Sequence, residues 1–344
     1  MRYARVLIGA VCVAALAVAI GGWSEDNDAH RNGRIVFQRL DPAVGKIRLY
    51  TMRPDGRDVK AITLPGAAED KDSIPDWSPD GRLIAFRRFF NRGEPNETTD
   101  VMVVRPDGSG LRNLTRGTCT GDCLSSETPA WSPDGRQIAF ERAIGPLPAD
   151  GPPPIVGIFV MDADGSNVRQ ITQLRPNSGT EDHGATWSPD GQRIAFMRSN
   201  NTIEPVDASA IYTVSSRGGD EQLVKRMPLE WPGAGGSDWS PDGKRLLFTT
   251  KCYFGQCAGP QPSTGAQLFT IRPDGEGLRQ LTHLPGNSGD ARWSPDGRKI
   301  VFSRNVTQGP TSDVYTMNAN GTNVRRLTNT PELDAHKPDW GPRR

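Results

Sequence analysis

The string Trp-Ser-Pro-Asp-Gly occurs five times in this chain of 344 residues. The copies begin at Trp77, Trp131, Trp187, Trp239 and Trp293, so they recur every 52 to 56 residues. An apolar run follows each copy, as in RLIAF after the first, and a second Asp-Gly string such as VRPDGSGLRNLT comes later in the repeat. Long strings that recur at a fixed period indicate a repeat architecture, in which each repeat is one structural unit.

Each repeat predicts four short antiparallel strands. The first ends at the Trp-Ser pair, where Pro, Asp and Gly suit a type I turn closed by a left-handed Gly. The second is the apolar run, for example residues 83–86, whose unbroken hydrophobicity is typical of a strand buried on both faces. The third strand, as in 158–161, leads through the second Asp-Gly turn to the fourth, as in 168–172. Four antiparallel strands repeated radially predict an all-β fold, a β-propeller.

The two ends of the repeat array complement one another. Residues 33–40, GRIVFQRL, match the second half of DGRKIVFSR but have no Trp-Ser-Pro-Asp before them. Residues 339–344, DWGPRR, match the first half, with Trp340 in register. We therefore predict a six-bladed propeller, with a ring closed by pairing of the C-terminal strand with the N-terminal blade, which removes exposed sheet edges. The propeller is predicted to span residues 33–344, after a short linker at 24–32.

A long apolar run lies at the N-terminus. Arg2 and Arg5 precede residues 6–20, which carry no charge, and small residues and then acidic ones follow. This order predicts a secretory signal within residues 1–23. The alternative is an uncleaved membrane anchor, because the run approaches spanning length if it continues to Trp23. Either way we expect a periplasmic or extracellular protein that meets a membrane only through its N-terminal segment.

Charge and motifs exclude several classes of function. The chain has 41 basic and 40 acidic side chains, which leaves no basic excess for binding nucleic acid. The sequence contains no Gly-x-Ser-x-Gly elbow, no phosphate-binding Gly loop and no His-Glu-x-x-His, the motifs of common hydrolases, nucleotide-binding proteins and metalloproteases. We therefore predict no catalytic residue, no cofactor and no resident metal.

The string WSPDGRQIAF followed by IFVMDADGSNVRQIT resembles the propeller repeat of the TolB family of bacterial periplasmic proteins. The same repeat is similar to the propellers of prolyl oligopeptidase-like peptidases and of some polysaccharide lyases. The resemblance covers residues 33–344 and implies a fold, whereas function lives in sites carried by the fold. TolB has an α/β domain before its propeller, for which residues 24–32 leave no room.

Acidic and histidine side chains recur three to five residues before the repeated Trp. The fourth-to-first connections there share one face with the second-to-third connections, and both vary greatly between repeats. Because function concentrates on variable loops held by a rigid scaffold, we expect this face to bind a partner at the mouth of the central channel. The residues expected there are Asp72, Glu127, Asp182, His183, Asp290 and His336.

Three interpretations of these residues stay open. They form a solvated polar rim, or a ligand site where carboxylates and imidazoles converge, or a metal site. His183 and His336 would lie on opposite sides of a six-fold ring, which disfavours ligation of one metal ion by both.

Aromatic and cysteine residues add two further predictions. Trp231, in the loop LEWPGAGG, would share a face with Tyr253 and Phe254, as an apolar contact surface or as a small satellite core. An even number of cysteines in an exported chain favours two local disulfides, with a four-thiolate zinc site as the alternative. The expected pairs are Cys119 with Cys123 and Cys252 with Cys257.

We expect a monomeric, non-enzymatic binding or scaffold propeller of the cell envelope. Its partner would be an envelope protein or a glycan. The alternative is a propeller enzyme, polysaccharide lyase or hydrolase-like, with an active site at the channel mouth.

Overall fold

The computed structural model describes residues 32–64, 71–91, 97–118, 123–145, 155–173, 180–200, 209–227, 234–250, 265–306, 311–330 and 332–342. Every regular element in these ranges is a β-strand. The same ranges contain no helix that is long and apolar enough to cross a membrane. The apolar N-terminal run lies outside them, so the export signal stays a prediction.

The strands form four four-stranded sheets and one eight-stranded sheet. The four-stranded sheets, in hydrogen-bonded order, are β24 (His336–Trp340), β1 (Ile35–Asp41), β2 (Lys46–Met52), β3 (Lys60–Ala61); β12 (Thr180–Trp187), β13 (Arg193–Asn200), β14 (Ala210–Ser215), β15 (Gln222–Arg226); β16 (Ala234–Trp239), β17 (Leu246–Thr250), β18 (Leu268–Ile271), β19 (Arg279–Gln280); and β20 (Asn287–Trp293), β21 (Lys299–Asn305), β22 (Asp313–Asn318), β23 (Arg325–Arg326).

The eight-stranded sheet consists of two groups of four strands. A single parallel bridge between Thr99 and Ser125 joins β6 of one group to β8 of the other, whereas the ladders within each group are antiparallel. The members are β4 (Lys71–Trp77), β5 (Ile84–Phe90), β6 (Thr98–Val104), β7 (Arg112–Asn113), β8 (Cys123–Trp131), β9 (Gln137–Ile144), β10 (Ile155–Asp162) and β11 (Arg169–Gln170).

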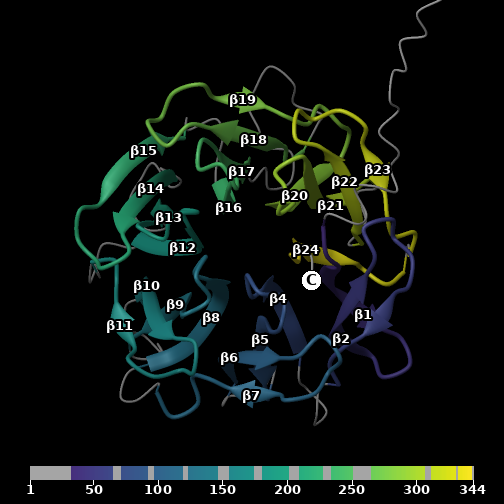
Figure 1. The fold of residues 1–344 in the computed structure, drawn as a ribbon, viewed down its shortest axis with the longest axis horizontal. Helices are drawn as coiled ribbons and strands as arrows, with labels where there is room; N and C mark the ends of the chain where they lie inside the picture. Colours follow the sequence, from purple (N-terminus) through teal and green to yellow (C-terminus); the bar gives the residue numbers. More distant parts are fainter. Residues whose placement is uncertain are drawn as a thin grey trace, which may run out of the picture.

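Figure 1 shows the sheets arranged around a common centre. The strands β4, β8, β12, β16, β20 and β24 lie nearest that centre, and we call them the inner strands; strands such as β7, β11, β15 and β19 lie at the periphery. Each inner strand contacts the next one, and β24 contacts both β20 and β4. Antiparallel sheets placed radially in this way form a β-propeller, as the repeats predict.

The two ends of the repeat array pair with each other. Ile35 of β1 lies opposite Trp340 of β24. Beside this pair, the amide of Gly33 donates to the carbonyl of Gly341 at 3.0 Å, and the indole Nε1 of Trp340 donates to the carbonyl of Gly33 at 3.2 Å. The C-terminal strand therefore supplies hydrogen bonds to an edge of β1 that would otherwise be open.

The second strand of each repeat is buried on both faces, as its apolar run predicts. In β5, the side chains of Ile84, Ala85 and Phe86 are all inaccessible to solvent. The apolar cores lie between neighbouring sheets, so that one core combines residues of β5 and β6 with residues of β8, β9 and β10. A fully buried Phe stands at the same place in each repeat: Phe37, Phe86, Phe140, Phe196, Phe248 and Phe302.

The predicted turn after the Trp-Ser pair is also confirmed. In the first copy, Gly81 has a left-handed φ of 68° and its amide donates to the carbonyl of Ser78 at 2.8 Å. Asp80 Oδ1 accepts hydrogen bonds from Ser78 Oγ at 2.7 Å and from the amide of Arg82 at 2.9 Å. The Asp of this motif is therefore a turn residue, engaged within its own hairpin.

Candidate functional site

The acidic and histidine residues expected on loops lie within the inner strands instead, which corrects the prediction. Pairing with the second strand begins well before the Trp, as between Lys71 and Phe89. The strands are longer than the sequence indicated because a bulge interrupts the alternation of side chains without ending the strand. The structure places Asp72 in β4, Glu127 in β8, Asp182 and His183 in β12, Asp290 in β20 and His336 in β24.

The bulge occurs at one repeat position, three residues before each Trp. In β4 the register shifts between Ser73 and Asp76, and Ile74 between them has a left-handed φ of 53°. A β-branched residue in this conformation is strained by roughly 1–3 kcal/mol. Such bulges re-aim the side chains that follow them. The left-handed residues are Ile74, Thr128, Gly184, Gly236, Asp290 and Lys337.

Two of the predicted acids form buried ion pairs with arginines. Asp72 accepts two hydrogen bonds from the guanidinium group of Arg88, at 2.6 and 2.8 Å. Asp182 accepts two from Arg198, at 2.6 and 2.9 Å, and Arg198 also contacts Glu221 at 2.8 Å. Bidentate pairs of this kind hold the inner strand to the second strand, and their carboxylate oxygens already have cationic partners.

Glu127 and His183 are likewise engaged with their neighbours. Glu127 forms an ion pair with Arg87. His183 lies between two carboxylates, with Nδ1 at 3.2 Å from Glu141 Oε2 and Nε2 at 3.0 Å from Glu181 Oε2. Burial disfavours a charged imidazole, but these two partners outweigh it and raise the pKa of His183 to about 10. His183 therefore carries a positive charge at neutral pH and donates both ring protons.

His336 occupies the same repeat position but differs from His183 in charge. Its Nδ1 is 3.4 Å from Asp334 Oδ2 and its Nε2 is hydrogen-bonded to Gln38. Burial lowers the pKa of His336, which leaves this ring neutral at neutral pH. Asp290 pairs with Lys337, and this cation outweighs the effect of burial and lowers the pKa of Asp290.

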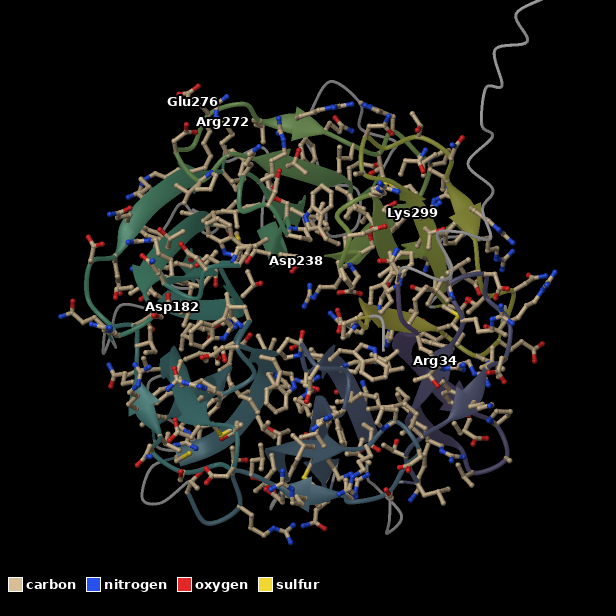
Figure 2. All side chains as sticks on the ribbon, viewed as in Figure 1. Arg34, Asp182, Asp238, Arg272, Glu276 and Lys299 are labelled. Atoms are coloured by element: carbon tan, nitrogen blue, oxygen red, sulfur yellow. The ribbon has the colours of Figure 1, made fainter. Side chains whose placement is uncertain are left out.

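A second set of charged residues stands immediately before the Trp of four inner strands. Asp76, Asp238, Arg292 and Asp339 occupy this position in β4, β16, β20 and β24, and we call them the central group. Figure 2 shows Asp238 beside the centre of the molecule. Sequence reasoning missed this set because it examined positions further from each Trp; the readable sign was an Asp or Arg directly before Trp-Ser or Trp-Gly.

Each carboxylate of the central group also joins neighbouring inner strands. One oxygen accepts a hydrogen bond from the backbone amide of the Trp in the next inner strand, at 2.7 Å in all three cases. The pairs are Asp76 with Trp131, Asp238 with Trp293, and Asp339 with Trp77. The second oxygen of each carboxylate is left to interact with the other charges of the group.

The electrostatics of the central group disfavour full ionisation. Burial raises the pKa of Asp76 well above its usual value, and the charge of Asp339 raises it further. Burial raises the pKa of Asp238 to about 7, although Arg292 opposes the change. Burial also raises the pKa of Asp339. Three carboxylates therefore share one guanidinium group, and a further cation at this place would favour their ionised forms.

The geometry favours an organic cation over a metal ion as the group that would bind here. Among the described residues, no three His, Cys, Asp or Glu side chains come close enough together to hold a metal. A lysine or arginine side chain can reach one or two carboxylates at a time and needs no such convergence.

Substitution Asp238→Asn is expected to stabilise the protein at pH 8. An acid whose pKa is raised on folding makes the folded state less stable as pH rises from its unfolded pKa, about 4, to its folded value. The amide oxygen keeps the hydrogen bond from Trp293 and removes this cost, so we expect a gain on the order of 1 kcal/mol at pH 8 and none near pH 4. Urea unfolding at both pH values measures it, with Glu276→Gln as an exposed control.

Four site predictions and one disulfide lie beyond the described residues. Trp231, Tyr253, Phe254, Cys252 and Cys257 are outside those ranges, as is Cys119. Cys123 is the first residue of β8. The aromatic contact surface and both disulfides therefore stay predictions.

Comparison with protein families and curated proteins places the repeats. Residues 157–344 match the family model of the TolB beta propeller domain. The chain is 26% identical over 306 residues to the Tol-Pal system protein TolB of Anaeromyxobacter dehalogenans, covering 81% of this chain and 65% of that protein. It is 26% identical over 248 residues to an uncharacterized peptidase, YuxL, of Bacillus subtilis, covering 71% of this chain and 31% of the peptidase. The chain thus spans between about a third and two thirds of these relatives.

Solved structures agree on the fold. TolB from Acinetobacter baumannii superposes with a TM-score of 0.62 at 19% identity, over 90% of this chain and 67% of that chain. A putative TolB from Agrobacterium tumefaciens gives 0.58 at 19% identity, over 90% of this chain and 99% of that chain. At this level of identity the likeness concerns the fold alone.

Proposed function

Because the chain belongs to the TolB β-propeller family, we propose that it is an exported, non-enzymatic binding protein of the bacterial cell envelope. Its partner is an envelope protein that places a cationic side chain or segment against the central group. The TolB protein of Anaeromyxobacter dehalogenans, named for the Tol-Pal system, supports an envelope role.

The proposal takes the propeller as a closed ring of six blades. The eight-stranded sheet counts as two blades, because one parallel bridge is all that joins its halves. The pairing of β24 with β1 and the bond from the amide of Trp77 to Asp339 support closure. A closed ring brings Asp76, Asp238, Arg292 and Asp339 to one centre, although they come from four separate blades.

The raised pKa of the three carboxylates is the observation that carries the binding role. Carboxyl groups with pKa values raised by burial and by one another destabilise the folded protein at neutral pH, so such arrangements are found where function needs them. A cation supplied by a partner lowers those pKa values again and recovers the lost free energy as binding energy. The residues predicted at the channel mouth and the aromatic patch around Trp231 would provide further contacts.

The experiment is capture of the partner in the native envelope. The protein is crosslinked in intact cells, purified and its partners identified by mass spectrometry, in parallel with Asp76→Asn/Asp238→Asn. Exposed residues Glu276 and Glu332 supply the matched control Glu276→Gln/Glu332→Gln, which removes the same charge. A protein captured by wild type and control but lost from the Asn variant supports the proposal.

Two results would contradict it. Equal capture by all three proteins would show that the central group does not bind the partner. Turnover of a polysaccharide or peptide by the purified wild-type protein would instead establish the competing function, an enzyme of the lyase or hydrolase-like class.

A further inference from the structure

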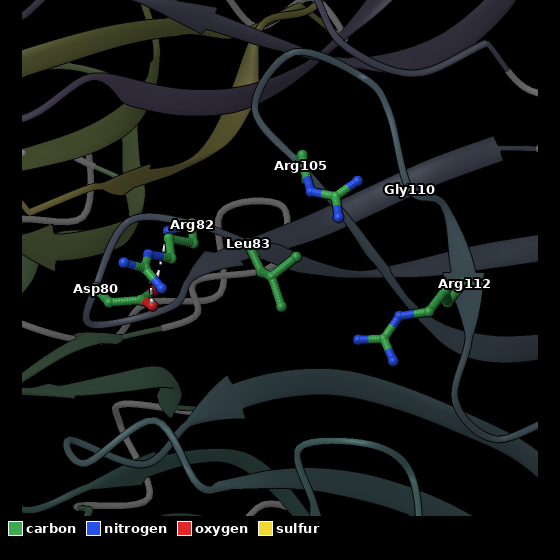
Figure 3. Close-up of a pocket in the computed structure, with 6 residues that line it drawn as sticks. All are labelled: Asp80, Arg82, Leu83, Arg105, Gly110 and Arg112. Carbon is green, nitrogen blue, oxygen red and sulfur yellow. Dashed lines mark hydrogen bonds and ion pairs between the residues drawn. The ribbon is translucent and has the colours of Figure 1, made fainter.

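A pocket of about 350 Å³ opens on the face that carries the tight turns, far along the strands from the loops predicted to bind a partner. It lies within the group β4–β7, between the β4–β5 turn and the β6–β7 turn (Figure 3). This volume is at the lower end of the range for small-molecule sites. The lining residues are Asp80, Arg82, Leu83, Arg105, Gly110 and Arg112.

The pocket arises from two departures from the repeat. At the position of Leu83 other repeats carry an arginine, which crosses to the neighbouring turn. At the position of Gly110 two of those repeats carry an aspartate that receives it. The crossing bonds are Arg34 Nη1 to Asp58 Oδ2 at 2.7 Å, Arg193 Nη1 to Asp220 Oδ2 at 2.7 Å, and Arg245 Nη1 to the carbonyl of Gly277 at 3.3 Å. Leu83 cannot make such a bond, so the space between the turns stays open.

Gly110 also sets the position of one arginine of the pocket. Its φ is +66°, and a Cβ added there would lie 2.4 Å from Arg105 Nη1. Any other residue would therefore displace the guanidinium group. Arg105 Nη1 also donates to Ser109 Oγ at 3.3 Å. In Figure 3 the guanidinium groups of Arg105 and Arg112 lie on one side of Leu83 and that of Arg82 on the other.

The charge around the pocket is positive. Three arginines face one acid, Asp80, whose Oδ1 is already occupied by Ser78 Oγ and by the amide of Arg82. On the neighbouring group, Asp164 senses the charge of Arg112, but its Oδ1 accepts hydrogen bonds from the hydroxyl and amide of Ser166. The surplus of guanidinium groups has no carboxylate of its own.

We propose that this pocket binds a small organic anion. The guanidinium groups of Arg105 and Arg112 hold its phosphate or carboxylate group, because the planar forks of arginine match both in geometry and charge. Leu83 supports its carbon skeleton, which an inorganic anion lacks. This site is separate from the central group and does not depend on its function.

Titration calorimetry with monobutyl phosphate, butyrate and inorganic phosphate tests the proposal on the purified protein. We expect saturable binding of at least one butyl compound, tighter than binding of inorganic phosphate by fivefold or more. The tighter of the two butyl compounds identifies the anionic group. Failure of both to bind at millimolar concentration would overturn the proposal.

Two variants locate the binding. Leu83→Arg restores the residue found in other repeats, so it should fold normally and weaken binding at least tenfold by filling the pocket. Arg112→Gln should weaken binding about fivefold, whereas Arg279→Gln, the same repeat position in the group β16–β19, should leave it within twofold. Unchanged binding by Leu83→Arg, or equal losses in both Gln variants, would show that the anion does not occupy this pocket. Melting curves confirm that each variant is folded.

Discussion

Removal of residues 339–344 is expected to lower the melting temperature by about 10 °C or more. The deletion takes away Trp340, a core residue that is 5% exposed and packs with Ile35, Phe37 and Met52 of β1 and β2. It also removes Asp339, which accepts the bond from the amide of Trp77. Loss of a buried Trp alone costs roughly 3–5 kcal/mol, and the freed edge of β1 invites aggregation.

Differential scanning calorimetry of the truncated protein measures the effect. Deletion of residues 343–344 alone is the control, since it leaves β24 and Trp340 in place. If the longer deletion melts at the temperature of the wild type, β24 does not close the ring and the six-bladed arrangement proposed here is wrong.

Substitution Asp72→Ala is expected to cost about 3–5 kcal/mol of unfolding free energy. The Asp72 side chain is wholly buried and Arg88 is 5% exposed, so the substitution leaves a guanidinium charge in the interior without its bidentate partner. The loss exceeds the worth of the ion pair, because most of it is the cost of the stranded charge.

Two further variants separate these contributions in urea unfolding experiments. Asp72→Leu combined with Arg88→Met replaces the pair by apolar groups and should fall within about 1 kcal/mol of the wild type. Asp58→Ala breaks the more exposed pair with Arg34 and should cost no more than about 1 kcal/mol. An Asp72→Ala variant as stable as Asp58→Ala would refute the buried pair.

The fold could be predicted from the sequence because its determinants are local. The turn at Ser78–Gly81 needs only Pro, Asp and a left-handed Gly in order. The burial of Ile84, Ala85 and Phe86 follows from an unbroken apolar run. Even the pairing of β1 with β24 was readable, because each end of the array lacks what the other has.

The site could be predicted only in part, because its geometry depends on the bulge. Ile74 in a left-handed conformation is not what a β-branched residue indicates, so the inner strands seemed to begin later than they do. The pairs of Asp72 with Arg88 and of Asp182 with Arg198 join residues 16 apart across two strands, and their register was needed to see them. The central group joins residues from four strands far apart in the sequence, which only the assembled ring brings together.

The affinity of the purified partner for the wild-type protein and for Asp76→Asn/Asp238→Asn tests the central claim most directly. Both Asn residues keep the acceptor for the neighbouring Trp amide and remove the charge. The account predicts that the variant is folded and at least as stable at pH 8, yet binds the partner at least tenfold more weakly, while Glu276→Gln/Glu332→Gln binds as the wild type does. A variant that binds with unchanged affinity would contradict the account, because the carboxylates would then serve only the fold.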